Sequence, residues 1–196
     1  MARARRAFAL AAGVLTLAVA RRLPAGDRES NPGTTTVAGV TTSFVGRELH
    51  VAAALAPSLP SDVANRLASG LPTTTTWRVR LVLYRPLWFN SFKDERLYEV
   101  TATYRPVTDD YTLERRLDDK LLDTRVVPTR DEAAAALARV PALPAFIMGS
   151  HLLGKSLAVK VKCVYGNGFA LGIIPTTTGT GWARSPVFEW TEAKTP

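Results

Sequence analysis

The stretch Thr73–Tyr84, TTTTWRVRLVLY, gives the clearest indication of the fold. In an extended chain one face would carry Trp77, Val79, Leu81 and Leu83, and the other Arg78, Arg80, Val82 and Tyr84. This period of two residues, carried by β-branched and aromatic types, predicts a β-strand with one buried face.

Similar patterns predict strands along most of the chain beyond residue 37. They cover Leu49–Leu55, Leu97–Tyr104, Tyr111–Leu117, Leu121–Val127, Ala145–Met148, Ser156–Tyr165, Phe169–Ile174 and Trp182–Trp190. Between Leu117 and Leu121 the residues Asp118-Asp119-Lys120 predict a hairpin with a polar turn.

Two short helices are expected between these strands. Ser61 is the expected cap of a helix over Asp62–Ser69, which Gly70 would end. The spacing Thr129-x-x-Glu132 has the form of a capping box, and a helix should follow in DEAAAALARV until Pro141 stops it.

The arrangement of these elements defines the fold class. Seven to nine short strands, joined mostly by gaps of turn length, favour antiparallel pairing over a parallel sheet with crossover helices. The chain of 196 residues, 46% of them hydrophobic, is long enough for one domain with a real core. We therefore expect a mainly β domain over residues 37–196, either an antiparallel β-sandwich or an open barrel, with two short helices.

The N-terminus differs from the rest of the chain. Three arginines precede an uncharged run, Ala7–Ala20, which ends in Ala18-Val19-Ala20 and is shorter than a membrane span. We expect residues 1–20 to be a cleaved signal peptide and residues 21–36 a flexible leader, so the protein would be exported to the periplasm, soluble or peripherally membrane-associated. A buried N-terminal helix is the alternative.

Charge also limits the partners that we expect. Removing residues 1–20 takes three of the 25 Lys and Arg residues, which leaves 22 against 17 Asp and Glu residues. This mild excess suits an anionic lipid or polysaccharide, but it is weaker than the basic charge typical of nucleic-acid binding proteins.

One segment matches a nucleotide-binding motif letter for letter. Gly149-Ser-His-Leu-Leu-Gly154-Lys155-Ser156 fits the phosphate-loop signature G-x-x-x-x-G-K-[ST]. That loop works by leading into a helix whose N-terminus helps to hold the phosphates. Here LAVKVKCVY follows, which alternates like a strand, so we expect no nucleotide at Gly149–Ser156.

No catalytic, cofactor-binding or metal-binding residues are predicted. Cys163 falls on the apolar face of the predicted strand and should be a buried, inert thiol. With only His50 and His151 besides that cysteine, a zinc site lacks ligands. Asp109-Asp110 and Asp118-Asp119 could pair as hydrolase carboxylates, but acids at such positions are more typical of solvated turns.

The linker YRPLWFNSFKDE between two strong strands is unusually aromatic. It holds Leu87, Trp88, Phe89 and Phe92, flanked by the basic residues Arg85 and Lys93. These side chains could fold back and close one end of the core. Alternatively, they project as a loop that docks on a membrane interface or a protein partner, and the flanking cations would suit anionic headgroups.

Several of these segments in order resemble a known group of proteins. They are SDVANRLASGLPTTTTWRVRLVLYRPLWF, the hairpin of Tyr104 and Tyr111, the T-x-x-E helix and the closing GWARSPVFEW. The chain is similar over about Leu49–Trp190 to exported bacterial proteins known only as a domain of unknown function. The resemblance implies an exported, mainly β domain and supplies no activity.

The function that we expect is therefore a binding or structural role in the cell envelope without enzymatic activity, with a protein or lipid partner. Two alternatives remain open. One is a small periplasmic carrier of lipid or another hydrophobic ligand. The other is a hydrolase whose carboxylates are not grouped in the sequence.

Overall fold

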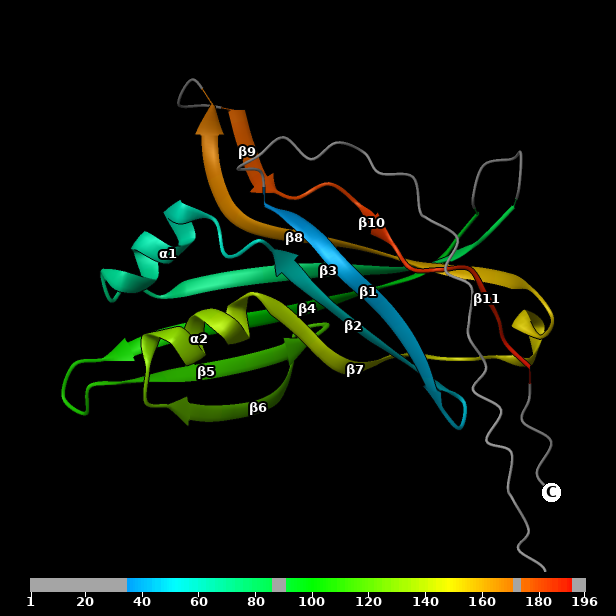
Figure 1. The fold of residues 1–196 in the computed structure, drawn as a ribbon, viewed down its shortest axis with the longest axis horizontal. Coiled ribbons are helices and arrows are strands. Elements are labelled where there is room, and N and C mark those ends of the chain that lie inside the picture. The colour runs from blue at the N-terminus through cyan, green and yellow to red at the C-terminus, as the bar shows by residue number, and fades with distance from the viewer. Residues whose placement is uncertain (1–34, 86–90, 171–173, 192–196) are drawn as a thin grey trace, which may run out of the picture. The chain divides into compact units, whose positions relative to one another are not determined.

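In the computed structural model, residues 35–85, 91–170 and 174–191 are described (Figure 1). The predicted signal peptide and nearly all of the predicted leader lie outside these ranges. The strands are β1 (Thr36–Val45), β2 (Glu48–Ala56), β3 (Thr73–Leu83), β4 (Ser91–Arg105), β5 (Asp110–Leu117), β6 (Lys120–Val127), β7 (Arg139–Ile147), β8 (Ser156–Ala170), β9 (Ile174–Gly179), β10 (Ala183–Arg184) and β11 (Phe188–Glu189). Two α-helices, α1 (Ser61–Ala68) and α2 (Arg130–Leu137), and one 3₁₀ turn, η1 (Ser150–Leu152), complete the fold.

The strands form two antiparallel sheets. The large sheet has eight strands, with the order β10-β8-β3-β4-β5-β6, and β9 and β11 also pair with β8. The small sheet has the order β1-β2-β7. The predicted mainly β, antiparallel class is confirmed as a sandwich-like arrangement that does not close into a barrel. The eleven strands in the described ranges exceed the predicted seven to nine, partly because the C-terminal segment contributes three short ones.

Strand β3 lies in the middle of the large sheet, as its pattern requires. It pairs with β4 on one side and β8 on the other, so that Trp77 lies opposite both Tyr98 and Cys163. Trp77 and Val79 have no exposed surface, and Leu81 is 2% exposed. The predicted buried face of β3 is therefore the centre of the core.

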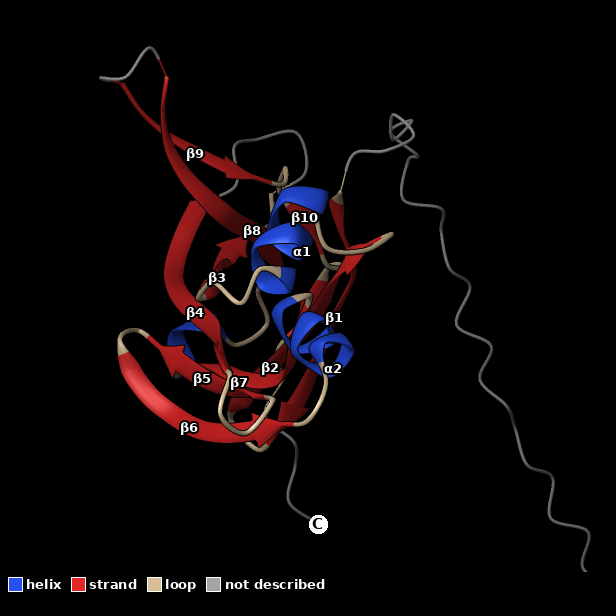
Figure 2. Cartoon of the chain, turned by 90° about the vertical axis from the view of Figure 1, so that its left-hand side faces the viewer, coloured by secondary structure: helices blue, strands red, loops and turns tan. Residues whose placement is uncertain are grey.

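Only one face of the large sheet is covered by other elements in the described ranges. The small sheet crosses it at one end, where β1 contacts β8 and β10 and β7 contacts β3. Helices α1 and α2 lie next to each other at the other end, against β3, β4, β5 and β6 (Figure 2). We name the covered side of the large sheet the inner face and the opposite side the outer face.

Helix α1 ends as predicted but begins differently. Gly70 has a φ of 73°, and its N–H donates to the Leu67 carbonyl while the N–H of Leu71 donates to the Arg66 carbonyl. These two bonds are those of a Schellman motif, which needs a residue with positive φ, here glycine. At the other end, the predicted Ser61 cap is wrong: Pro60 is the capping residue, and no side chain caps the helix.

Helix α2 begins as predicted but ends earlier than predicted. The Thr129 hydroxyl accepts a hydrogen bond from the Glu132 N–H at 3.2 Å, as the capping box predicts. The expectation that Pro141 ends the helix is wrong, because α2 ends at Leu137 and β7 already begins at Arg139. Pairing of Ala53 with Val140 and a hydrogen bond from the Leu55 N–H to the Ala138 carbonyl draw the chain into the small sheet.

The hairpin between β5 and β6 confirms its predicted turn. Asp118 and Asp119 form a two-residue connection with φ angles of 49° and 65°, the left-handed values of a type I′ turn. Aspartate tolerates this conformation better than most residues.

The C-terminal segment closes one edge of β8 in pieces. Strands β11, β10 and β9 pair with successive parts of β8. Between these pieces two buried hydroxyls complete the pairing: Thr180 accepts from the Cys163 N–H, and Ser185 accepts from the Val159 N–H, both at 3.0 Å. The Ser185 N–H in turn donates to the Val159 carbonyl at 2.8 Å.

We expect replacement of Ser185 with alanine to lower the free energy of unfolding by about 1–3 kcal/mol, because the Val159 N–H loses its buried acceptor. Thr180→Ala should lower the free energy of unfolding by a similar amount, because the Cys163 N–H then loses its buried acceptor. Urea unfolding followed by circular dichroism measures both changes. The control is Ser43→Ala on β1, where the side chain is exposed and the expected change is within about 0.5 kcal/mol. Equal stability of Ser185→Ala and Ser43→Ala would contradict the assigned role.

Candidate functional site: a basic face on the large sheet

Basic side chains gather on the outer face of the large sheet. We name this group the basic face: Arg78 and Arg80 on β3, Lys160 and Lys162 on β8, and Arg184 on β10. The strand register brings them together. Arg80 lies opposite Lys160, and Arg184 lies opposite the same lysine on its other side. Arg78 lies opposite Lys162 in the next row.

This placement works against stability. Like charges that lie directly opposite on neighbouring strands repel each other and destabilise a sheet. On the basic face such pairs occur in two adjacent rows, and Lys160 has a cation on both sides. A fold optimised for stability alone would alternate the signs, and these rows of cations can instead contact anionic groups outside the sheet.

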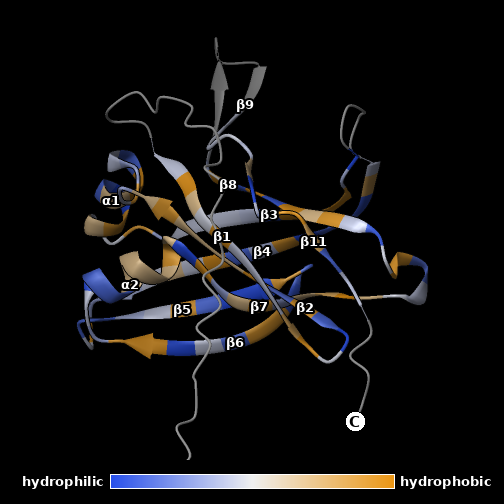
Figure 3. Cartoon of the chain, turned by 45° about the vertical axis from the view of Figure 1, so that its right-hand side comes forward, coloured by the Kyte–Doolittle hydropathy of each residue, from blue (hydrophilic) through white to orange (hydrophobic). Residues whose placement is uncertain are grey.

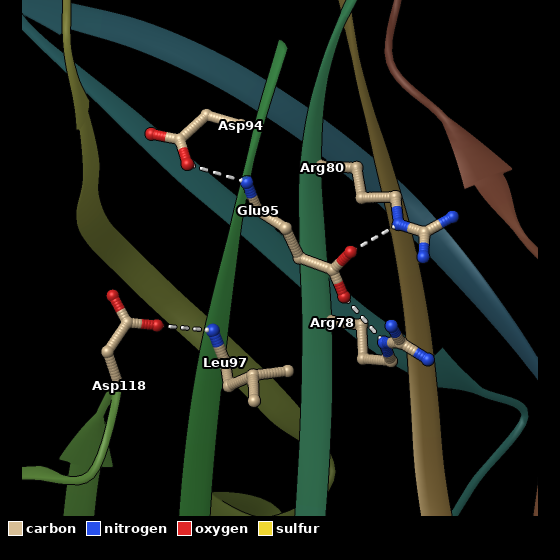
Figure 4. A network of polar contacts seen from close by, with 6 residues as sticks. All are labelled: Arg78, Arg80, Asp94, Glu95, Leu97 and Asp118. Atoms are coloured by element: carbon tan, nitrogen blue, oxygen red, sulfur yellow. Dashed lines mark hydrogen bonds and ion pairs between the residues drawn. The ribbon is translucent and has the colours of Figure 1, made fainter. Parts of the chain in front are cut away.

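One carboxylate, Glu95 on β4, partly balances these charges. Its two oxygens accept hydrogen bonds from the Nε atoms of Arg78 and Arg80 at 2.6 Å and 2.5 Å (Figure 4). Burial raises the pKa of Glu95, but the hydrogen bonds and charges of the two arginines outweigh burial, so the pKa lies below its usual value. Glu95 therefore stays ionised at neutral pH and holds the two guanidinium groups in place.

Aromatic rings stack on two of the arginines. The guanidinium carbon of Arg80 lies 4.4 Å from the ring centre of Trp182 and 5.7 Å from that of Phe92. The guanidinium of Arg184 lies 5.1 Å from the ring centre of Tyr84. Phe92 is 57% exposed and Trp182 is 38% exposed, so both rings also present apolar surface to solvent. The face thus combines cations with exposed aromatic rings.

A shallow hollow adjoins the basic face. It has a volume of about 520 Å³ and is open to solvent. Its lining consists of Thr76, Arg78, Glu95, Leu97, Asp118, Val164 and Thr177. Asp118 is held there because one of its oxygens accepts the Leu97 N–H at 2.8 Å (Figure 4). The hollow offers charged and apolar contacts next to each other.

The predicted docking loop borders this face where it is described. Leu87, Trp88 and Phe89 lie outside the described residues. Phe92 stacks on Arg80 and is exposed, which differs from the expectation that the aromatic residues close the core. Lys93 and Arg85 are exposed at the two sides of the loop. The sequence pattern placed Arg78, Arg80, Lys160 and Lys162 on polar strand faces but did not join them into one site.

The segment Gly149–Ser156, which matches the phosphate-loop signature, is followed by a strand, as its sequence predicts. A 3₁₀ turn over Ser150–Leu152 and a glycine with positive φ, Gly154, lead directly into strand β8 at Ser156. The Gly154 N–H donates to the Trp190 carbonyl at 3.1 Å. This segment therefore joins β7 to β8 and anchors the C-terminal segment. The absence of a nucleotide there stays a prediction.

The remaining candidates for chemistry have structural partners. Cys163 is fully buried as predicted, and burial raises the pKa of its thiol to about 12. Asp109 has a φ of 53° and accepts a hydrogen bond from the Tyr104 hydroxyl at 2.7 Å, while Asp110 pairs with Arg105 at 2.6 Å. The two adjacent acids therefore serve a turn, as their sequence position suggests.

Among residues 35–85, 91–170 and 174–191, no three His, Cys, Asp or Glu side chains gather closely enough to hold a metal ion. In the same ranges no helix has the length and apolar character needed to cross a membrane.

Comparison with known proteins defines the family. A family described as a domain of unknown function, DUF4390, matches residues 35–164. The chain belongs to this family, in agreement with the resemblance seen in the sequence. None of the curated proteins and none of the solved structures gives a significant match. The matched range includes four cations of the basic face, whereas Trp182 and Arg184 lie beyond it.

Proposed function

We propose that this protein is a non-enzymatic binding module of the cell envelope, whose basic face binds anionic phospholipid at a membrane surface. The observation that carries the proposal is the placement of cations opposite cations in two adjacent rows of one sheet. Their mutual repulsion is relieved when phosphate groups lie against them, so ligand binding would recover the stability that the free protein lacks.

The chemistry of the face suits phospholipid headgroups. Arginine and lysine bind phosphate oxygens, and each cation near an anionic membrane contributes about 1 kcal/mol to binding. Phe92 and Trp182 expose aromatic surface beside these cations. Aromatic rings prefer the boundary between headgroups and acyl chains. Phosphate contacts and shallow aromatic insertion would therefore act together.

Export belongs to the proposal as well. It rests on the predicted signal peptide of residues 1–20, which would bring the protein to a membrane surface in the envelope. The absence of catalysis is proposed because the acid pairs that could serve a hydrolase form turn hydrogen bonds and ion pairs instead, as at Asp109 and Asp110.

Vesicle binding tests the proposal directly. The protein from Arg21 onward should sediment with vesicles of phosphatidylcholine and phosphatidylglycerol, and much less with phosphatidylcholine alone. Binding should fall steeply with salt, because the screening length shortens from about 10 Å at 0.1 M to about 3 Å at 1 M. Equal binding to both vesicle types, or none to either, would refute lipid binding. Capture of soluble polyglutamate without vesicle binding would indicate an acidic protein partner instead.

A further inference from the structure

A second surface lies at the opposite edge of the large sheet, on β6. This strand is the last in the sheet order, so within the described ranges its outer edge pairs with no other strand. Three of its apolar side chains are exposed: Leu121 by 49%, Leu122 by 46% and Val126 by 52%. Figure 3 shows the apolar ends of β6 on either side of a hydrophilic middle. A free edge with apolar side chains can accept a further strand.

A cleft between β6 and β7 accompanies this edge. Two hollows, of about 350 Å³ and about 160 Å³, share Tyr98, Arg115 and Pro141 in their linings. The larger continues to Leu122 and Asp123 on β6, and the smaller reaches Arg125, Ala136 and Arg139. Since the two hollows share lining residues, they lie next to each other beside β6, and we refer to them together as the arginine cleft.

The charges in this cleft are mostly positive. Arg115 binds Asp123 with two hydrogen bonds, one of them from Nε at 2.5 Å. The hydrogen bond from Arg115 lowers the pKa of Asp123. Arg125 and Arg139 are exposed, and in the described part of the chain neither forms an ion pair. Two guanidinium groups are therefore available to carboxylates of a ligand.

We propose that β6 and the adjacent arginine cleft bind an extended acidic segment of a partner polypeptide, which adds a strand to the large sheet. The backbone of the segment pairs with the free edge of β6, the usual mode of strand addition. Side chains of an extended segment alternate between its two faces. Carboxylates on one face reach Arg125 and Arg139, and apolar side chains on the other lie against Val126.

A second copy of this chain is a poorer occupant of the same edge. Strand β6 carries Lys120 and Arg125, and its one acid, Asp123, is already paired with Arg115. Two copies of β6 side by side would bring unbalanced cations together, which destabilises strand pairing. An acidic segment instead complements these charges.

A synthetic peptide of eight alternating glutamate and valine residues, labelled with fluorescein, tests this proposal. Its fluorescence anisotropy should rise and saturate with added protein. Hydrogen exchange of the β6 amides should slow in the complex, because the peptide backbone covers them. The double variant Arg125→Gln/Arg139→Gln should weaken binding roughly 10-fold or more, because two charge-assisted contacts are lost.

The matched control is Lys160→Gln/Lys162→Gln, which removes the same charge from the basic face and should leave peptide binding unchanged. The same double lysine variant should weaken vesicle binding, so the proposed lipid site and the proposed peptide site can be refuted separately. A peptide with lysine in place of glutamate should not bind. The proposal is overturned if the two peptides bind equally, if Arg125→Gln/Arg139→Gln binds as the wild type does, or if free glutamate competes as well as the peptide.

Discussion

Replacing Trp77 with alanine is expected to lower the free energy of unfolding by about 3–5 kcal/mol. Among the described residues the indole is the largest fully buried side chain, and it lies at the centre of the large sheet, between Tyr98 and Cys163 in register. Alanine would leave a cavity among strands that are held in place by pairing on both sides and cannot collapse around it. Urea unfolding followed by far-ultraviolet circular dichroism measures the loss.

Two control variants test whether the loss of stability comes from the buried volume of the Trp77 side chain. Trp77→Phe keeps most of the volume and also removes a buried indole N–H that finds no hydrogen-bond acceptor among the described residues, so its cost should be clearly smaller. Trp182→Ala removes the same atoms from a ring that is 38% exposed and should cost far less than Trp77→Ala. A loss below about 1 kcal/mol for Trp77→Ala would show that the core is not organised around this residue.

Reversing two charges on β8 is expected to abolish vesicle binding while keeping the fold intact. Lys160→Glu/Lys162→Glu changes four unit charges on the basic face, which at about 1 kcal/mol each corresponds to a roughly 1000-fold weaker affinity. The same change turns three repulsive cross-strand pairs into attractive ones: Lys160 with Arg80, Lys160 with Arg184, and Lys162 with Arg78. Stability should therefore stay equal or rise by about 0.2–1 kcal/mol for each pair.

The expected loss of vesicle binding without a loss of stability distinguishes a binding role of these lysines from a structural one. If the lysines served the fold, their reversal would lower the midpoint of urea unfolding and weaken binding together. Lys155→Glu is the control, because Lys155 is exposed in the loop before β8 and carries the same charge. Its effect on vesicle binding should be much smaller. Unchanged binding of the double variant would refute the basic face as the lipid site.

The local features of the fold were predictable from the sequence because they depend on neighbouring residues. Alternation at Trp77, Val79 and Leu81 identified the buried face of β3. The capping hydroxyl of Thr129 and the turn at Asp118-Asp119 also follow from short-range hydrogen bonds and backbone preferences. The strand after Ser156 was predicted in the same way, which distinguished it from the helix of a true phosphate loop.

Features that depend on distant pairing were not predictable. The sequence places Arg80 and Lys160 on polar faces of their strands, but only the register between β3 and β8 makes them neighbours. Pairing with β2 likewise starts β7 at Arg139, where local propensity favours continued helix. The cleft at β6 depends on distant pairing within both sheets, since Arg125 and Arg139 come from strands of different sheets. Alternation within one strand carries no information about its partner.

The pairing of three short strands with the edge of β8 also affects the tendency of the protein to aggregate. Strand β8 has 15 residues, and the side chains of Leu157, Val159 and Val161 on it are buried. Without the segment that contains Thr180, Ser185 and the three short strands, this edge would present unpaired backbone groups along an apolar strand. Such an edge is a template for aggregation between molecules. This C-terminal segment lies wholly beyond the range shared with the family, and by covering the edge of β8 it protects the molecule against self-assembly as well as supporting the basic face.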